Sequence, residues 1–339
     1  MGYNVIVAGA TGAVGTEMIL ALEQFNFPVD DLKLLASARS VGKKLKFRGR
    51  EIAVEELTKD SFKGYQIAFF SAGGGRSLEF APAAAAAGCV VIDNSSAYRM
   101  DPQVPLVVPE VNPEAAQVRP KGIIANPNCS TIIMNVPVWP LHQANPVTRM
   151  VVSTYQAVSG AGAWGLWELD EQIKAYANGQ PIAPNKFPHQ IVNNVFAHNS
   201  AVGANGYNEE EMKMVNETRK IFSAPGIMVT ATCVRVPVPR AHCEAINLEF
   251  SRPITPAEVR AILAKAPGVK IVDEPAKNHF PMPLEASNQD DILVGRIRQD
   301  ISRTDGRGID LFVAGDQIRK GAATNAIQIA QVLAERRWL

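Results

Sequence analysis

The stretch Asn4-Val5-Ile6-Val7-Ala8-Gly9-Ala10-Thr11-Gly12-Ala13-Val14-Gly15 opens the chain and decides its fold. Its first half is an apolar run typical of a buried strand, and its second half spaces three glycines as GxxGxxG before a helical stretch. Backbone must approach a pyrophosphate closely at the start of that helix, which explains the absence of side chains. The alternative is a simple tight turn. We predict a dinucleotide-binding loop with contacts from Gly9, Thr11, Gly12, Ala13, Val14 and Gly15.

Short apolar runs continue to alternate with helical stretches over the first third of the chain. This alternation is typical of a parallel sheet with helices on both faces. The tract Ala83 to Ala87 fits one of these helices because Gly88 follows it as a C-cap. We therefore predict an α/β fold with a Rossmann-type domain over residues 1–130. Its strands are expected at Tyr3 to Ala8, Leu32 to Ala36, Gln66 to Ser71, Cys89 to Asp93 and Ile123 to Ala125.

The end of the second expected strand indicates which dinucleotide binds. A site for NAD carries an acidic residue there, whereas this strand runs into Ser-Ala-Arg-Ser at 37–40. Hydroxyl groups and a positive charge suit a 2′-phosphate, so we predict NADP as the cofactor, with Ser37, Arg39 and Ser40 as its ligands. Asp30 and Asp31 precede the strand and lie at the wrong end of it.

Beyond residue 130 the pattern changes to longer alternating strands with fewer helices between them. Such strands indicate a mostly antiparallel sheet. We predict a second, α+β domain over residues 131–320, and the apolar spacing of Gly321 to Leu333 indicates a helix that returns residues 321–339 to the first domain. The strands are expected at Arg149 to Val158, Ile227 to Val238, Ala245 to Phe250, Ile292 to Arg298 and Ile309 to Ala314, with helices near 163–177, 208–222 and 255–265.

The composition excludes several classes of protein. A chain of 339 residues exceeds the usual size of a single core, which agrees with two domains. Lys and Arg number 34 against 33 Asp and Glu, and a formal charge of +1 argues against a broad nucleic-acid-binding surface. No apolar run reaches membrane-spanning length and no secretory signal is visible, so we expect a cytoplasmic protein without membrane association. The four cysteines show no CxxC pair or zinc spacing, so we expect neither metal nor structural disulfide.

Cys129 stands between the short apolar run Gly122 to Ala125 and a helical stretch that begins at Ser130. At such a junction, helical N–H groups and the positive end of the helix dipole lower the pKa of a thiol, and they can also hold an oxyanion. The position therefore suits a nucleophile. The alternative is an inert buried thiol, which we expect for Cys89 and Cys233 in their strand-like runs.

The segment Asn126-Pro127-Asn128-Cys129-Ser130-Thr131 resembles the nucleophile motif of the aspartate-semialdehyde dehydrogenase family. Arg235 and His242 also stand at a spacing that this family carries. The resemblance implies that Cys129 attacks an aldehyde, that Asn128 and backbone donors hold the resulting oxyanion, and that His242 acts as acid and base. It also implies that Arg235 pairs with the substrate carboxylate.

Weaker matches follow in the order of the family. Arg99, after an Asn-Ser-Ser segment, and Lys213 would hold phosphate, with Glu210 near the substrate. Because Glu209 and Glu211 flank Glu210, it stays open which of the three faces the substrate. The three glutamates also fit an acidic first turn of a helix, with Lys213 as an i,i+3 partner. Gln156 would orient the substrate, although an amide on a long strand otherwise indicates an exposed position. The cofactor side would further include Gly73, Ser159, Gly160, Gly162 and Asn325.

These matches span nearly the whole chain and imply an enzyme. The reaction is the reversible, phosphorylating oxidation of L-aspartate 4-semialdehyde to 4-aspartyl phosphate with NADP and inorganic phosphate. The resemblance places it in lysine, diaminopimelate, threonine and methionine biosynthesis, carried out by a homodimer. Because the nicotinamide must lie over the thiohemiacetal, we expect the active site between the two domains. Two alternatives stay open, N-acetyl-gamma-glutamyl-phosphate reductase and a redox sensor that binds NADP without turnover.

Overall fold

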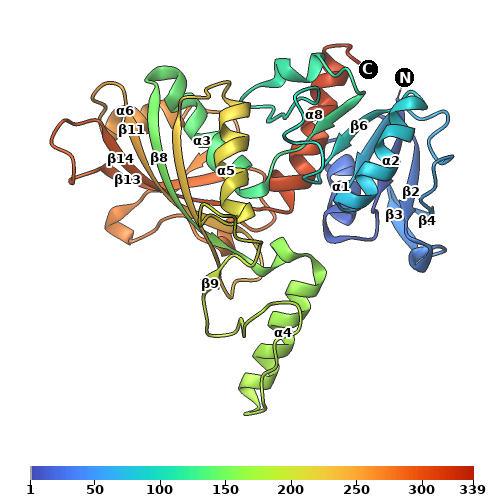
Figure 1. Cartoon of the computed structure of the whole chain (residues 1–339), viewed down its shortest axis with the longest axis horizontal. Coiled ribbons are helices and arrows are strands. Elements are labelled where there is room, and N and C mark those ends of the chain that lie inside the picture. Colours follow the sequence, from blue (N-terminus) through green and yellow to red (C-terminus); the bar gives the residue numbers. More distant parts are fainter. Residues whose placement is uncertain (1) are drawn as a thin grey trace. The chain divides into compact units, whose positions relative to one another are not determined.

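The computed structural model describes residues 2–339, which divide into two compact units. The first unit runs through Asn128 and resumes at Ala322–Leu339, and the second comprises Cys129–Gly321. No helix within residues 2–339 is long and apolar enough to cross a lipid bilayer. Figure 1 labels many of the elements of both units.

The first unit is built on a seven-stranded sheet in the order β3-β4-β2-β1-β5-β6-β7. All neighbours pair in parallel except the β3–β4 pair. The order reverses at β1, where β2 lies on one side and β5 on the other, and ligands of open α/β sheets bind outside strand ends at such a point. The strands are β1 (Tyr3–Ala8), β2 (Val29–Ala36), β3 (Lys44–Phe47), β4 (Arg50–Glu56), β5 (Ile67–Phe70), β6 (Val90–Asp93) and β7 (Ile123–Ala125).

Helices cover the first sheet and complete its core. The carboxyl-terminal α8 (Thr324–Glu335) packs on α1 (Ala13–Gln24), and α2 (Gly74–Ala86) packs on β5 and β6. The strands β1, β5, β6 and β7 are nearly continuous apolar runs, as is typical of strands buried on both faces, whereas β3 and β4 are charged and largely exposed. Two short 3₁₀ helices, η1 (Ala38–Ser40) and η2 (Pro113–Gln117), lie in the connections.

The hairpin of β3 and β4 was not among the strands expected from the sequence. Its two-residue turn, Arg48-Gly49, has positive φ at both positions, +48° and +74°, as a twisted hairpin requires. Arginine is an uncommon residue there, so the usual Asn-Gly signal is missing. The second strand itself begins at Val29 and includes Asp30 and Asp31, which still lie at the end opposite to the glycine loop.

The second unit contains a seven-stranded sheet in the order β12-β13-β14-β11-β8-β10-β9. Its four antiparallel pairs agree with the prediction of a mostly antiparallel sheet, while β8–β10 and β12–β13 pair in parallel. The strands are β8 (Val147–Gln156), β9 (Phe196–Ala197), β10 (Met228–Arg235), β11 (His242–Phe250), β12 (Val269–Ile271), β13 (Ile292–Gln299) and β14 (Gly308–Gly315).

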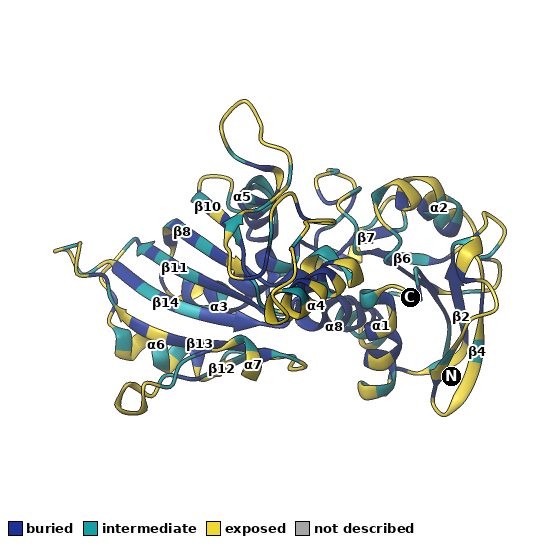
Figure 2. Ribbon diagram, turned by 90° about the horizontal axis from the view of Figure 1, so that it is seen from below, coloured by how far each residue is buried: buried dark blue, intermediate teal, exposed yellow. Residues whose placement is uncertain are grey.

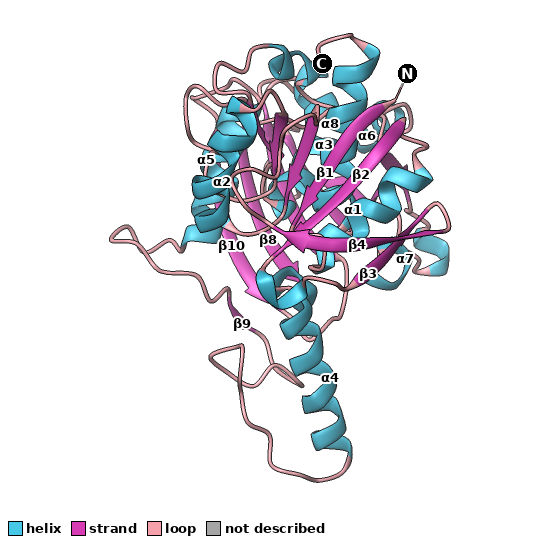
Figure 3. Cartoon of the chain, turned by 90° about the vertical axis from the view of Figure 1, so that its right-hand side faces the viewer, coloured by secondary structure: helices cyan, strands magenta, loops and turns pink. Residues whose placement is uncertain are grey.

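One helix of this unit is almost entirely buried. α3 (Cys129–Ala144) packs on β11, β14 and β8, and buried residues run along most of its length (Figure 2). α5 (Glu209–Ile221) packs on β10, whereas α4 (Ala163–Ala177) projects away from the sheet of its own unit (Figure 3). The remaining helices are η3 (Val158–Ala161), α6 (Pro256–Leu263), η4 (Pro275–Lys277) and α7 (Pro283–Ala286).

Several strand ends differ from the prediction. β10 stops at Arg235, because Pro237 and Pro239 lack the N–H that a sheet ladder needs, and β8 stops at Gln156, before η3. β11 begins at His242 rather than Ala245, so this histidine opens a strand. The last helix begins at Thr324, after a π-helical turn at Arg319–Ala323.

Candidate active site

Three polar side chains form a row across neighbouring strands of the second sheet. Parallel pairing sets Arg235 of β10 beside Gln156 of β8. Antiparallel pairing sets Cys243 beside Tyr155, and the next step of the register brings His242 beside Gln156. The three side chains share one face and are only 2%, 1% and 0% exposed. Gln156 is thus buried, although strand alternation alone would indicate an exposed position.

Cys129 is the first residue of α3 and lies close to this row. A Cβ built on Gly321 would come within 2.9 Å of the Cys129 Cβ, so only a glycine fits beside the thiol. Arg235 interacts electrostatically with Cys129. The other cysteines are buried, and burial raises the pKa of Cys89 to about 11, that of Cys243 to about 12, and that of Cys233 as well. Cys129 alone combines partial exposure with a helix start.

Arg235 is a buried cation whose hydrogen-bonding capacity is only partly used. Its Nη1 donates to the Ala157 carbonyl oxygen at 2.6 Å, and its Nε has no partner among the described residues. Burial lowers the pKa of Arg235, and the charge of Glu210 opposes this effect. A buried guanidinium with an unused donor suits an anionic ligand, because a carboxylate can accept two parallel hydrogen bonds from it.

The structure separates the three consecutive glutamates of α5. Glu210 is buried and accepts from the Gln156 amide at 3.2 Å and from Lys213 at 3.0 Å. Glu211 closes the capping box with Asn208, and Glu209 is exposed. Only Glu210 therefore joins the row, and the i,i+3 pair with Lys213 exists as well.

His242 is held through one ring nitrogen. The backbone N–H of Ala157 donates to Nδ1 at 3.0 Å, so the neutral ring carries its proton on Nε2. Nε2 has no partner within residues 2–339. Burial and the Arg235 charge keep the pKa of His242 well below its usual value. A Cβ on Gly160 would lie 3.1 Å from Nε2, so this turn lies tightly against the ring and a side chain there would crowd it.

His198 was missed at the sequence level although it belongs to the same neighbourhood. Its Nδ1 lies 3.1 Å from the Ser200 Oγ, and that hydroxyl accepts from the Glu210 N–H at 3.2 Å. Burial lowers the pKa of His198 to about 4, with Glu210 opposing the shift. The residue lies in an irregular segment without periodicity, so no sequence pattern could have indicated it.

The predicted cofactor residues of the first unit come together around β1. Gly9 has φ +90°, and a Cβ there would lie 2.4 Å from the Ser71 carbonyl oxygen. A Cβ on Gly15 would lie 2.2 Å from the Gly9 carbonyl oxygen. The helix α1 begins directly after Gly12 without a side-chain cap, which leaves its first N–H groups available to an anion. The hydroxyls of Thr11 and Ser40 lie 3.2 Å apart and so join the loop to the end of β2.

Other predicted residues of the first unit make contacts within that unit. Ser37 is half-buried and Arg39 exposed, and Gly73, with φ +89°, precedes α2. Arg99 is buried and donates to the carbonyls of Asn126 and Asn94 at 3.0 and 2.8 Å. Asn325 donates to Val107 and Asn126, and Asn128 is buried. Their predicted ligand contacts stay predictions.

Two family models match the chain. One, described as the semialdehyde dehydrogenase NAD binding domain, matches residues 4–118, and the other, the semialdehyde dehydrogenase dimerisation domain, matches residues 138–320. Aspartate-semialdehyde dehydrogenase from Synechocystis sp. is 55% identical over 336 residues, which cover 99% of this chain and 98% of that protein. The chain belongs to the aspartate-semialdehyde dehydrogenase family.

Solved structures agree with this membership. The structure of aspartate-semialdehyde dehydrogenase II from Vibrio cholerae complexed with ASA has 47% identity and a TM-score of 0.96, with 99% of each chain covered. The enzyme from Candida albicans, solved with NADP, has 25% identity and a TM-score of 0.77, with 100% of each chain covered. Members of the semialdehyde dehydrogenase family are oxidoreductases, and the family match on the second unit covers the whole buried row. Cys129 falls between the two matched ranges.

Proposed function

We propose that this enzyme catalyses the reversible, NADP-dependent, phosphorylating oxidation of L-aspartate 4-semialdehyde to 4-aspartyl phosphate. The observation that carries the proposal is the row of Arg235, Gln156 and His242 with Cys129 beside it. Cys129 supplies a thiol at a helix start, and the row supplies a donor to an oxyanion and a buried cation for a carboxylate.

The first step joins the thiolate of Cys129 to the aldehyde carbon and gives a thiohemiacetal oxyanion. Nε2–H of His242 donates to that oxygen, and backbone donors at the start of α3 and Asn128 add to its stabilisation. Hydride then leaves the same carbon for NADP⁺, and the oxyanion collapses to a thioester. No proton has to be accepted in this step. Acceptance at Nε2 would require the tautomer with a proton on Nδ1, which would face the Ala157 N–H.

The charged groups around the row select the substrate. Arg235 holds the substrate carboxylate through parallel hydrogen bonds. Glu210, whose carboxylate already contacts Gln156 and Lys213, accepts from the free amino group of the substrate. An acetylated amine has no cation to offer to Glu210, and for this reason we favour the aspartyl substrate over N-acetylglutamate semialdehyde.

Phosphate attacks the thioester in the second half of the reaction and releases Cys129 as a thiolate. Lys213 and Arg99 are the cations assigned to phosphate. Lys213 is part-exposed, and its ion pair with Glu210 keeps the ammonium at the edge of the row. The phosphate oxygen forms the new bond to the acyl carbon as the carbon–sulfur bond breaks.

The two units divide the work in this proposal. The first unit binds NADP through the glycine loop, and the second unit, which begins with Cys129, carries catalysis and forms a homodimer. Ser37, Arg39 and Ser40 contact the 2′-phosphate. The bond between the Thr11 and Ser40 hydroxyls supports this role because it fixes the end of β2 against the loop that takes the pyrophosphate.

An assay of NADPH formation tests the proposal. Aspartate semialdehyde should support phosphate-dependent turnover, and N-acetylglutamate semialdehyde should not. Cys129→Ala should lose about four orders of magnitude in kcat while NADP binding, measured by fluorescence titration, is retained. Cys89→Ala is the matched control, because its thiol is buried in the first unit. Undiminished turnover of Cys129→Ala would refute the mechanism, whereas a wild type that binds NADP without turning over either semialdehyde would favour a redox sensor.

A further inference from the structure

The turn that precedes His242 is held in an uncommon conformation. Ala241 is buried and has φ +70°, a region that residues other than glycine rarely adopt. Such a conformation persists only when the surroundings fix it. The Ala241 N–H donates to the Oε1 of Gln317 at 2.9 Å. The residue next to the catalytic histidine is thus fixed by a side chain that the predicted site did not include.

The same amide also holds a second turn. The Nε2 of Gln317 donates to the hydroxyl of Ser159. Ser159 lies in η3, between Ala157, which donates to the His242 ring, and Gly160, which touches that ring. Gln317 therefore contacts two segments through its amide. The oxygen accepts from the main chain just before His242, and the nitrogen donates to the turn that contacts the imidazole.

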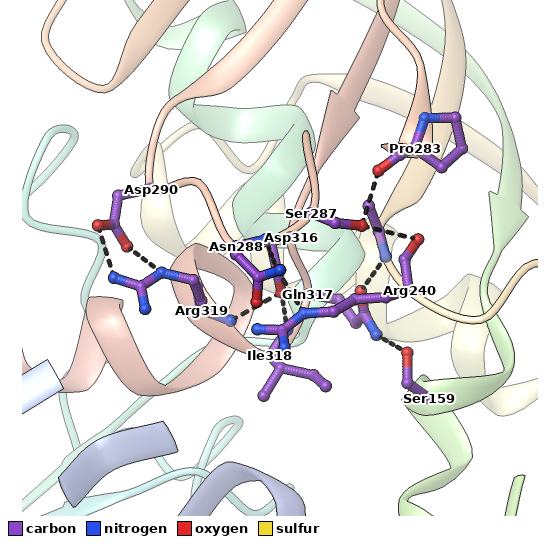
Figure 4. A network of polar contacts seen from close by, with 11 residues as sticks. Ser159, Arg240, Pro283, Ser287, Asn288, Asp290, Asp316, Gln317, Ile318 and Arg319 are labelled. Atoms are coloured by element: carbon purple, nitrogen blue, oxygen red, sulfur yellow. Dashed lines mark hydrogen bonds and ion pairs between the residues drawn. The ribbon is translucent and has the colours of Figure 1, made fainter. Parts of the chain in front are cut away.

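Gln317 is itself fixed by a network of polar contacts, shown in Figure 4. Its neighbour Asp316 is fully buried, and one carboxylate oxygen accepts from the N–H groups of Ile318 and Arg319. The other oxygen accepts from Arg240 and from the Asn288 N–H, each at 2.6 Å. These contacts place Asp316 and Gln317 directly after β14, whose last residue, Gly315, pairs with His242.

Gln317 also lies next to the nucleophile. A Cβ on Gly321 would be 2.9 Å from the Cβ of Cys129 and 3.3 Å from the Cβ of Gln317. Both side chains therefore border the same glycine. A shift of Gln317 would displace the His242 ring relative to Cys129, and a misplacement of about 1 Å can cost about 100-fold in rate.

We propose that Gln317 is a positioning residue of this enzyme: its amide joins the turns before and beside His242 and so fixes the imidazole, with its proton on Nε2, against Cys129. The inference rests on the proposed function for its kinetic consequence, whereas its structural content, the fixed ring and tautomer, can be measured without turnover.

Three substitutions test the proposal. Gln317→Leu keeps the size of the side chain and removes both hydrogen bonds. We expect kcat to fall about 10- to 100-fold with the KM of semialdehyde within about threefold, because binding groups stay in place. Gln317→Asn should fall to a similar level, because its shorter amide reaches only one of the two turns. Asp290→Asn is the control, since it weakens the Arg319–Asp290 ion pair of the same network without touching either turn.

A second readout covers the case in which Gln317→Leu fails to fold. Gln317→Glu keeps the shape and can accept from both Ala241 N–H and the Ser159 hydroxyl, but it adds negative charge near His242. Because both turns stay joined, the His242 ring of Gln317→Glu should keep the single Nε2 tautomer at about pH 8, measured by ¹⁵N NMR. A tautomer mixture in this variant would overturn the proposal.

Histidine NMR separates this inference from the proposed function. In protein labelled with ¹⁵N at histidine, the His242 signal should report a single tautomer protonated on Nε2, and Gln317→Leu should convert it into a tautomer mixture. If the wild type shows the fixed tautomer but no semialdehyde turnover, the proposed function fails and the positioning role stands. A fixed tautomer in folded Gln317→Leu, with kcat within twofold of wild type, would overturn the positioning role.

Discussion

The glycine loop of the first unit and the buried row of the second both lie at strand ends, but they are built from different material. The loop is one contiguous segment, Gly9 to Gly15, and it works because side chains are absent. The row brings Gln156, Arg235 and His242 from three strands to one end of a sheet. A site made of backbone is sensitive to added volume, whereas a site made of side chains is sensitive to changes in charge and geometry.

Gly15→Ala should have the largest effect on stability. The added Cβ would meet the Gly9 carbonyl oxygen at 2.2 Å, and because its nearest neighbours are all backbone atoms, no side-chain rotation can relieve the clash. We expect a loss of about 3 kcal/mol in the free energy of unfolding, at the upper end of overpacking costs, measured by urea denaturation. Gly75→Ala is the control, because nothing lies within 4 Å of its new Cβ and alanine favours the α2 helix. A loss below about 0.5 kcal/mol for Gly15→Ala would show that the glycine loop is not especially sensitive to added volume.

Arg235→Lys tests the row through geometry, since the charge is kept. Lysine offers a point charge instead of two parallel donors, so we expect kcat/KM for semialdehyde to fall by about 10- to 150-fold, with a raised KM. Steady-state kinetics at fixed NADP and phosphate measure both constants. Arg149→Lys, in a part-exposed ion pair with Glu249 on the same sheet, is the matched control and should stay within about twofold. An unchanged KM in Arg235→Lys would remove the carboxylate assignment.

Glu244→Gln tests how a buried, titratable carboxyl group near His242 affects the stability of the fold. Glu244 lies two residues beyond His242 on β11, is fully buried, and neither carboxylate oxygen has a partner among the described residues. Burial raises the pKa of Glu244 well above 4.5. The protonated form is therefore favoured in the folded state, so its stabilising contribution is complete below about pH 4.5 and is lost as pH rises.

The glutamine variant carries no titrating group at this position. Its free energy of unfolding, measured by urea denaturation from pH 4 to pH 8, should match the wild type most closely at pH 4 and exceed it increasingly towards pH 8. A difference that stays constant across this range would show that Glu244 does not titrate differently in the folded and unfolded states.

Arg39→Ala should have the smallest effect, because the side chain is exposed and solvent screens its charge. We expect NADP binding to weaken by about two- to fivefold and NAD binding to stay the same. Isothermal titration with both cofactors measures the difference. Lys43→Ala, on the same segment, is the control. An equal loss for both cofactors would mean that Arg39 does not contact the 2′-phosphate.

Prediction from sequence succeeded where the signal is contiguous. The Rossmann-type sheet followed from alternating apolar runs, and the helix expected from Ser130 after an apolar run is α3, which begins one residue earlier at Cys129. Boundaries were less accurate where local signals compete. β11 was expected to begin at Ala245, but pairing with β14 and β8 extends the strand back to His242.

The residues that the sequence missed act through contacts rather than patterns. His198 and Gln317 carry no motif, and each acquires its place from an element distant in the chain. The hairpin of β3 and β4 was missed for a different reason, because its turn uses Arg48 where asparagine is usual.

The sequence by itself determined the features that depend on neighbours along the chain: the glycine loop after a strand, the thiol at a helix start, and the spacing of Arg235 and His242. Short-range sterics and helix dipoles govern these features, and both act over a few residues. Only the tertiary structure decided that Glu210 rather than Glu209 or Glu211 joins the row, that the neutral His242 ring carries its proton on Nε2, and that Gln317 joins two turns. These depend on strand register and packing, which bring together atoms from distant parts of the chain.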